Sequence, residues 1–397
     1  MNSSSGKRRL RLKMESLDPN RTANQLPVTV LTGFLGSGKT TLLNHLIRHD
    51  AFGRTLVLIN EFGEVGIDHD LVTEARDDVV VEMASGCVCC TIRGDLVKTL
   101  RDAPGRFARG GTLWFDRVVI ETTGLADPAP ILQTLMTEPS VTKRYRLDSV
   151  VTTVDAANGE QTLHSHAESV KQVAMADRLL ITKTDLVDDE ELARLQSRLR
   201  ALNPAASQTR VEQGAIDAEL VLRAGGYDPE TKSLDAQAWL RAEALPQHHH
   251  HDHDHDHDHD HDHDHDHNDV NRHDEHINAF CFVVEEPVQR DALDAFFDTL
   301  MLLRGADLLR VKGLVNVVGE SGPVIVHGVQ HVFHPKVVLD AWPTDDRRTR
   351  IVFITRDISE ETLKNTFDAF VDTDALRAAI NHVKRTEPST SANDALS

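Results

Sequence analysis

The sequence lacks long hydrophobic runs and has few cysteines, and both features exclude whole classes of protein. No stretch approaches the roughly 18 consecutive apolar residues of a transmembrane helix, so we expect no membrane span and no membrane partner. The basic, serine-rich N-terminus has no apolar core like that of a secretory signal. It is typical of a disordered leader or of translation starting at Met14, with a targeting tail as the alternative. Only four cysteines occur in 397 residues, which favours a reducing compartment, the cytoplasm, where clustered thiols serve as metal ligands or redox groups more often than as disulfides.

The sequence also lacks a basic patch interleaved with aromatic residues, so nothing in it predicts nucleic-acid binding. The formal net charge is −20, but half of it lies between His248 and Glu275, where ten Asp, one Glu and one Arg give −10. The rest of the chain is only mildly acidic. The length of 397 residues predicts two domains with tails.

The most informative segment is Gly33–Thr40 (GFLGSGKT), which fits the phosphate-binding pattern G-x-x-x-x-G-K-[ST]. The apolar run Val28–Leu31 before it predicts a buried strand, and the apolar residues after it have helical spacing. In such a strand, loop and helix, backbone N–H groups surround the phosphates of a nucleotide at the helix N-terminus. Lys39 would reach the β- and γ-phosphates, and the hydroxyl of Thr40 would ligate Mg²⁺.

Acidic residues follow the next predicted strands. Glu61 and Glu64 come after Thr55–Ile59, at the sheet edge where ligands bind in open α/β folds, although a solvated loop charge is an equal alternative for each. Glu121 ends the following buried strand, where an acid can hold Mg²⁺ or its water. The N–H of Gly124, shortly after it, is placed to contact a γ-phosphate.

Three thiols in four residues, Cys87, Cys89 and Cys90, form the second strong signal. Thiolates are soft ligands that suit Zn²⁺, Cu(I) or tetrahedral Co²⁺. In an extended segment Cys90 would point away from the other two, so only a turn brings all three to one ion. The spacing is not that of a closed four-ligand structural site, which favours an open site that can hand the metal on; buried unreactive cysteines or a redox pair are the alternatives. Because the γ-phosphate loop is expected to be a neighbour, we hypothesise coupling between nucleotide state and metal binding.

Two further strands are expected, one at Ser149–Val154 with Asp155 at its end and one at Asp177–Ile181, and the second leads into the sequence TKTD. The carboxylate of Asp185 can accept hydrogen bonds from the ring N–H and amine of guanine, while the stem of Lys183 lies over the base. Thr182 replaces the Asn that is usual in guanine sites, which leaves strict guanine selectivity open. A surface turn is the alternative.

After a weakly patterned region from Asn203 to Leu245, residues 248–267 contain twelve His alternating with Asp. This tract has no apolar residues, so we expect it to be disordered. Imidazoles beside carboxylates would capture Zn²⁺, Ni²⁺ or Co²⁺ weakly at each site but at many sites at once, and would release the metal below about pH 6. A plain hydrophilic linker is the alternative. The predicted ligands include His253, His255, His257 and His259.

The alternation of apolar and polar residues after residue 276 predicts a small α+β domain. Its expected strands are Ile277–Val284, Leu308–Val318, Val324–Phe333 and Thr349–Thr355, and its expected helices are Leu293–Leu303 and Ser359–Phe370. Within it, His327 and His331 would share a strand face, with His334 beyond. These histidines would receive or relay metal, and surface and rim histidines are the favoured alternative.

Taken together, the chain resembles the CobW-like family of P-loop GTPases. The resemblance rests on GFLGSGKTTLL, NEFGEVGID, SGCVCC, IETTGLADP and TKTD in family order, then a His-rich linker, then a stretch from VKGLVNV to RIVFITRDI that is similar to the CobW C-terminal domain. It implies an α/β fold, a P-loop NTPase with a mostly parallel sheet and helices on both faces, plus a smaller α+β C-terminal domain. The expected division is a leader (1–25), a GTPase domain (26–245), a metal-binding linker (246–276), a C-terminal domain (277–385) and a tail (386–397).

The resemblance also implies a role for each matching residue. Cys87, Cys89 and Cys90 would hold the cargo metal, Glu121 and Gly124 would serve the γ-phosphate region, and Thr182, Lys183 and Asp185 would bind guanine. The residues implied to bind the phosphates and Mg²⁺ are Gly33, Gly36, Ser37, Gly38, Lys39, Thr40 and Thr41.

The implied activity is slow GTP hydrolysis by a metallochaperone that passes Zn²⁺ to a client apo-metalloprotein. Co²⁺ for cobalamin synthesis or for nitrile hydratase is an alternative cargo, because the same ligands bind both metals. A passive zinc store is an alternative from another class. A P-loop kinase or ligase would need an acceptor pocket and a general base, and the sequence identifies neither.

Overall fold

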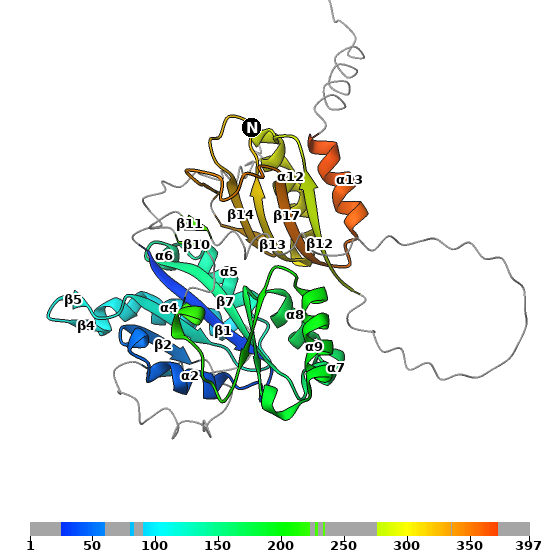
Figure 1. Ribbon diagram of the computed structural model, residues 1–397. Helices are drawn as coiled ribbons and strands as arrows, with labels where there is room; N and C mark the ends of the chain where they lie inside the picture. Colours follow the sequence, from blue (N-terminus) through cyan, green and yellow to red (C-terminus); the bar gives the residue numbers. More distant parts are fainter. Residues whose placement is uncertain are drawn as a thin grey trace, which may run out of the picture.

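The computed structural model describes residues 25–59, 80–82, 90–222, 227–228, 233–234, 276–334 and 336–371. These residues form two domains, each built on its own sheet (Figure 1). None of the helices in these ranges is long and apolar enough to cross a membrane.

The first domain contains a seven-stranded sheet in the order β3-β2-β6-β1-β7-β8-β9, and every neighbouring pair is parallel. The predicted parallel α/β sheet is therefore confirmed. The strands are β1 (Leu26–Gly33), β2 (Thr55–Ile59), β3 (Val80–Glu82), β6 (Arg117–Glu121), β7 (Tyr145–Asp155), β8 (Arg178–Thr182) and β9 (Ser207–Val211). The helices are α2 (Lys39–Ile47), α4 (Cys90–Arg106), α5 (Ala129–Thr137), α6 (Pro139–Thr142), α7 (Gly159–Ser165), α8 (Ala167–Ala174), α9 (Asp189–Leu202) and α10 (Ala218–Leu222). Short elements are η1 (Asp50–Phe52), η2 (Thr184–Leu186), and the paired strands β4 (Ala108–Arg109) with β5 (Thr112–Leu113) and β10 (Tyr227–Asp228) with β11 (Ser233–Leu234).

Helices bury both faces of this sheet, which explains why its central strands are continuous apolar runs. Val28 and Val30 of β1 pack in a cluster with residues of α4 and α5. Leu31 points to the opposite face, where it packs with residues of α2 and α10. At the β8 side of the sheet, Leu179 and Ile181 pack with α7, α8 and α9.

The strand register brings the chemically important segments to one edge of the sheet. Leu31 is aligned with Glu121, Gly33 with Thr153, and Asp155 with Thr182. The loops that follow β1, β6, β7 and β8 therefore meet at the carboxyl edge, where parallel α/β sheets bind their ligands.

The second domain is an antiparallel sheet in the order β12-β17-β13-β14-β15, with β16 paired to β14. Its strands are β12 (Ile277–Val284), β13 (Leu308–Val315), β14 (Val324–Val329), β15 (Val332–Phe333), β16 (Val337–Val338) and β17 (Thr349–Arg356). One face packs against α12 (Arg290–Arg304) and α13 (Glu360–Val371) through a cluster rich in phenylalanine, and η4 (Gly305–Asp307) joins α12 to β13.

One predicted strand of this domain is wrong. Instead of a single strand from Val324 to Phe333, the chain forms a hairpin in which Val329 pairs with Val332. The turn is made by Gln330, whose φ of 50° ends the extended conformation, and by His331. His327 and His331 therefore do not share a strand face.

The two domains share a buried apolar interface. Leu309, Val329 and Ile354 from the second sheet belong to the same cluster as residues of β1, β6, α4 and α5. Contacts run from β14 and β15 to α5, from β13 to α8, and from β12 to α9. In Figure 1 the second domain, yellow to orange, accordingly lies directly on the helices of the first.

Candidate functional site

The segment between β1 and α2 has a backbone that only glycine-rich sequences adopt readily. Gly33, Gly36 and Gly38 have φ values of 141°, 70° and 91°. A Cβ on Gly33 would also lie 2.2 Å from Thr153 Oγ1, so β7 leaves no room for a side chain there. Gly38 is the N-cap of α2 in the left-handed conformation. The loop therefore needs the glycines that the phosphate-binding pattern predicts.

Lys39 follows this loop, and its ammonium group lies against the loop backbone. Its Nζ donates hydrogen bonds to the carbonyl oxygens of Gly33 (2.8 Å) and Phe34 (3.1 Å), and the side chain is only 8% exposed. Thr40 is the second residue of α2 and is half-buried. The first turn of α2 has no acidic residue. A cation held by the loop at an uncompensated helix N-terminus fits an anion such as a nucleotide phosphate.

Hydroxyl groups of two neighbouring strands anchor the loop. Ser37 Oγ lies 2.6 Å from Thr153 Oγ1 at the end of β7. Thr182 Oγ1, at the end of β8, donates a hydrogen bond to the backbone oxygen of Ser37 (2.8 Å). The shorter threonine at the first position of TKTD thus connects the predicted base-binding segment to the phosphate loop.

The loop after β6 touches the phosphate loop. Glu121 at the end of β6 is buried, with 7% exposure. A Cβ on Gly124 would lie 2.6 Å from the backbone nitrogen of Leu35, so only glycine permits this approach. The predicted γ-phosphate segment and the phosphate loop are therefore in direct contact.

The predicted base-binding residues lie at the end of β8. Lys183 has a left-handed backbone, with φ of 55°, and its Nζ donates a hydrogen bond to Asp155 Oδ2 at 2.7 Å. Asp155 also accepts hydrogen bonds from the backbone N–H of Ala157 and from Asn158. Burial raises the pKa of Asp155, but the hydrogen bonds from Lys183, Asn158 and Ala157 outweigh it and hold the pKa below its usual value. Asp185, in η2, is exposed to solvent.

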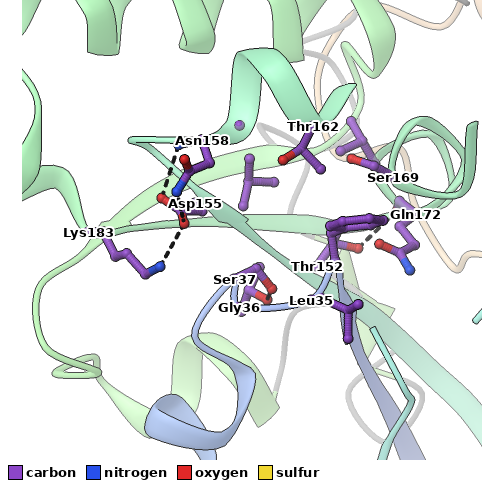
Figure 2. Close-up of a pocket in the computed structure, with 15 residues that line it drawn as sticks. Leu35, Gly36, Ser37, Thr152, Asp155, Asn158, Thr162, Ser169, Gln172 and Lys183 are labelled. Carbon is purple, nitrogen blue, oxygen red and sulfur yellow. Dashed lines mark hydrogen bonds and ion pairs between the residues drawn. The ribbon is translucent and has the colours of Figure 1, made fainter. Parts of the chain in front are cut away.

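A cavity of about 180 Å³ borders these segments (Figure 2). In Figure 2, Asp155, Asn158 and Lys183 lie on the left, Ser169 and Gln172 lie on the right, and Gly36 and Ser37 of the phosphate loop lie below and between them. A separate, more open groove of about 520 Å³ lies beside α2, where Thr41 is one of the lining residues. Thr41 is exposed in this groove and does not line the cavity beside the phosphate loop, so its predicted role in phosphate binding stays a prediction.

Several predicted metal ligands lie outside the described residues. Cys90 is described by its backbone alone, as the first residue of α4. In the part of the chain that the structure describes, no three His, Cys, Asp or Glu side chains are grouped so that they could hold a metal ion. The metal site therefore stays a prediction. The residues outside the description are Glu61, Glu64, Cys87, Cys89, His253, His255, His257 and His259.

The three C-terminal histidines are arranged differently from the prediction. The imidazole rings of His327 and His334 lie 4.6 Å apart across the hairpin, while His331 is exposed in the turn. The Nε2 atoms of the pair are buried, with no hydrogen-bond partner among the described residues. Burial and the nearby charge of Arg310 lower the pKa of both imidazoles, to about 4 for His334. The same cationic surroundings disfavour a divalent ion. His331 therefore fits the favoured surface interpretation, while the half-buried His327 and His334 fit the rim interpretation and are poorly suited to relay metal.

One functional candidate was not predicted from the sequence. Asp155 was expected only as the residue at the end of a strand, but the structure pairs it with Lys183. The available signal was its position, because a carboxylate at the carboxyl end of a strand beside TKTD satisfies the same criterion as Glu61 and Glu121.

A glycine-rich phosphate loop at the carboxyl edge of a parallel sheet is the defining feature of the P-loop nucleotide-binding proteins, and the first domain belongs to that class. Comparison with known proteins narrows the class to a family. Residues 27–210 match the CobW/HypB/UreG nucleotide-binding domain, and residues 277–371 match the cobalamin synthesis protein cobW C-terminal domain. The chain belongs to the CobW-like family, as the sequence motifs indicate.

Similar proteins cover almost the whole chain. It is 31% identical over 344 residues to the zinc chaperone YjiA of Escherichia coli, which spans 87% of this chain and 98% of that protein. It is 33% identical over 379 residues to the zinc chaperone CobW of Pseudomonas aeruginosa, with 87% of this chain and 92% of that protein covered. The crystal structure of the Zn(II)-bound YjiA GTPase from E. coli superposes with a TM-score of 0.62 at 27% identity, over 87% of this chain and 99% of the other.

Proposed function

We propose that this protein is a GTP-hydrolysing metallochaperone that carries Zn²⁺ and passes it to a client apo-metalloprotein. The observation that carries the proposal is the contact of three segments at one sheet edge. The phosphate loop is hydrogen-bonded to Thr182 and touches Gly124, so the candidate groups for phosphate, γ-phosphate and base are held together. The zinc chaperones YjiA and CobW among its relatives support the same function.

Each residue of the site has a role that follows from its position. Lys39 and the backbone N–H groups of Gly33–Thr41 bind the phosphates, because the loop already holds the ammonium and its glycines expose the backbone. The hydroxyl of Thr40 and the carboxylate of Glu121 would hold Mg²⁺, which would supply positive charge at the phosphates. Lys183, fixed by Asp155, covers the base, and Asp185 provides the exposed carboxylate that selects guanine.

The proposed cargo site consists of the thiolates of Cys87, Cys89 and Cys90. Glu61 and Glu64, which follow β2, are further candidate ligands. The described structure connects to this site through α4, which begins at Cys90. Apolar residues of α4 pack in one cluster with residues of β6. The His/Asp tract at residues 248–267 would act as a reservoir. We infer a cytoplasmic location, because three clustered thiols stay reduced and able to bind metal there.

The proposal is tested by competition titration of Zn²⁺ and Co²⁺ on the full chain, with Mg²⁺ and either a non-hydrolysable GTP analogue or GDP. The affinity of the cysteine site for its cargo is expected to be at least about tenfold higher with the GTP analogue than with GDP. A tenfold ratio lies within the usual range of allosteric coupling. A variant with Cys87, Cys89 and Cys90 replaced by Ser should lose that difference. The matched control is Cys281→Ser, which removes a half-buried cysteine of the second domain and should keep the difference.

The outcomes separate the competing functions. If a chain lacking residues 248–267 keeps the nucleotide-dependent difference, the reservoir is independent of the cargo site. If the affinity is the same with GTP analogue and GDP, nucleotide-gated delivery is wrong and a passive metal store is the better explanation. A greater nucleotide dependence for Co²⁺ than for Zn²⁺ would make cobalt the cargo.

A further inference from the structure

The loop that follows β6 is fastened to helix α8. Gln172 Nε2 donates hydrogen bonds to the backbone oxygens of Gly124 (3.2 Å) and Ala126 (3.0 Å). The preceding residue, Lys171, forms an ion pair with Asp127 at 3.0 Å. Two adjacent residues of one helix therefore hold the segment in which Gly124 touches the phosphate loop.

Gln172 is well suited to hold a loop in place. Its side chain is buried, with 1% exposure, and its own backbone oxygen accepts a hydrogen bond from Thr152 Oγ1 of β7 (2.9 Å). Its Oε1 is buried and has no hydrogen-bond partner among the described residues. The two carbonyl acceptors therefore dictate the orientation of the amide, even though its own oxygen is left unpaired.

The helices on either side of this loop are the ones that carry the second domain. Helix α5 begins at Ala129, directly after the loop, and its Gln133 donates a hydrogen bond to Gln330 in the hairpin turn at 2.9 Å. Three residues beyond the end of α8, Asp177 forms ion pairs with Arg310 and Lys312 of β13. Both helices also bury apolar residues against Leu309, Val329 and Ile354.

The ion pairs at Asp177 make this interface specific. The side chains of Asp177 and Arg310 are 1% and 2% exposed. Burial raises the pKa of Asp177, but the charges of Arg310 and Lys312 outweigh it and hold the carboxyl below its usual pKa. Moving β13 relative to Asp177 would break the ion pair between the buried Asp177 and Arg310, so β13 is expected to move with the segment that joins α8 to β8.

We propose that Gln172 is a positioning residue that ties the γ-phosphate loop to the second domain, so that the hairpin at Gln330 responds to GTP and not to GDP. The inference rests on the proposed nucleotide site and goes beyond it, because it gives the second domain a part in reading the nucleotide state. A contact at Gly124 displaces the loop, and the displacement reaches the second domain by two routes. Gln172 passes it to α8, which packs against β13, and α5 passes it directly to the hairpin. By reciprocity, contacts at the hairpin set the discrimination between GTP and GDP.

The experiment uses the full chain and measures amide hydrogen exchange in residues 324–338, with Mg²⁺ and saturating GTP analogue or GDP. The parental protein should show at least a twofold difference in exchange rate at the hairpin between the two nucleotides. Gln172→Met keeps the size of the side chain and removes both donated hydrogen bonds, so it should reduce the difference, while the direct route through α5 remains. An unreduced difference in Gln172→Met overturns the positioning role of Gln172. The control Gln161→Met changes an exposed glutamine of α7 that bonds only its neighbour Ser165 and should leave the difference intact.

A second variant keeps the test decisive if Gln172→Met fails to fold. Gln330→Ala removes the hydrogen bond to Gln133 far from the nucleotide and should lower the ratio of GTP-analogue to GDP affinity by about two- to tenfold, the size expected for one hydrogen bond. Equal exchange with both nucleotides, or an unchanged affinity ratio in Gln330→Ala, overturns the inference while nucleotide binding stands. Failure of the parental chain to bind either nucleotide overturns the proposed function and this inference with it.

Discussion

Asp155 Oδ2 accepts a hydrogen bond from Lys183 Nζ at 2.7 Å, and both residues line the cavity beside the phosphate loop. Asp155→Asn removes the charge that orients Lys183 and keeps the side-chain shape. Because Lys183 is 37% exposed, solvent screens the pair, and we expect a loss of about 1 kcal/mol, or about fivefold in GTP affinity. The measurement is fluorescent-nucleotide titration with steady-state kinetics. KM should rise while kcat stays constant, and the exposed-site control Asp102→Asn should change neither.

Gly124→Ala should disable nucleotide recognition. The added Cβ would lie 2.6 Å from the backbone nitrogen of Leu35, so one of the two loops must move. We expect at least about a tenfold loss in affinity for the GTP analogue, equivalent to about 1.4 kcal/mol, and a smaller loss for GDP. The matched control is Gly105→Ala, an exposed helical position where nothing lies within 4 Å of the new Cβ. A Gly124→Ala protein with parental GTP-analogue affinity would show that this contact is dispensable.

Asp177→Asn should destabilise the whole protein. It removes the carboxylate that pairs with the buried side chains of Arg310 and Lys312, which costs about 3–5 kcal/mol of unfolding free energy. Urea unfolding followed by circular dichroism provides the measurement. Asp116→Asn breaks an ion pair whose side chains are 58% and 52% exposed, and it should change the unfolding free energy by no more than about 1 kcal/mol. Equal effects of the two substitutions would contradict a buried structural role for Asp177.

The half-buried pair His327 and His334, whose Nε2 atoms are buried, should make stability fall in mild acid. Burial and Arg310 lower both pKa values in the folded state, so below the unfolded value of about 6.5 the unfolded chain binds more protons than the folded chain. The unfolding free energy should therefore decrease by about 1.4 kcal/mol per histidine between pH 7.5 and 5.5, and continue to fall toward pH 4. Asp177 does not contribute between pH 7.5 and 5.5, because its carboxyl is ionised in both the folded and the unfolded chain over that range.

This pH dependence is measured by urea unfolding in the presence of a chelator, which removes the contribution of metal bound to other histidines. His334→Gln should reduce the slope of unfolding free energy against pH, even if it lowers stability at pH 7.5. The exposed-site control His45→Gln should leave the slope unchanged. A parental slope that persists in His334→Gln would assign the effect to other groups.

The strands of the nucleotide-binding sheet could be predicted where burial makes the sequence apolar. Thr55–Ile59 is predicted and observed with the same bounds, and Val28–Leu31 forms the centre of β1. Strand β9 was missed because only Val211 in its sequence SQTRV is apolar. It lies at the edge of the sheet and pairs only with β8, so its position depends on backbone hydrogen bonds that leave no hydrophobic pattern.

The residues of the candidate site could be predicted where they belong to a local sequence motif. The glycines of the phosphate loop and Gly124 fall where the patterns place them, because their backbone geometry demands glycine. The partnership of Asp155 with Lys183 depends on strand order, and the ion pairs of Asp177 join residues more than 130 positions apart. Such contacts come from tertiary packing, and local sequence does not encode them. The hairpin at Gln330 was missed for a different reason, since its turn contains neither glycine nor proline.

The apolar cluster that joins the two sheets has a practical consequence for dissecting the protein. Leu309, Val329 and Ile354 cover side chains such as Leu132, Leu135 and Met175 of the first domain. A fragment that ends before residue 276 would present this surface to water, where it would favour aggregation. Activities assigned to the nucleotide-binding half expressed alone would then describe a damaged protein, and point substitutions in the intact chain are the sounder way to separate the two halves.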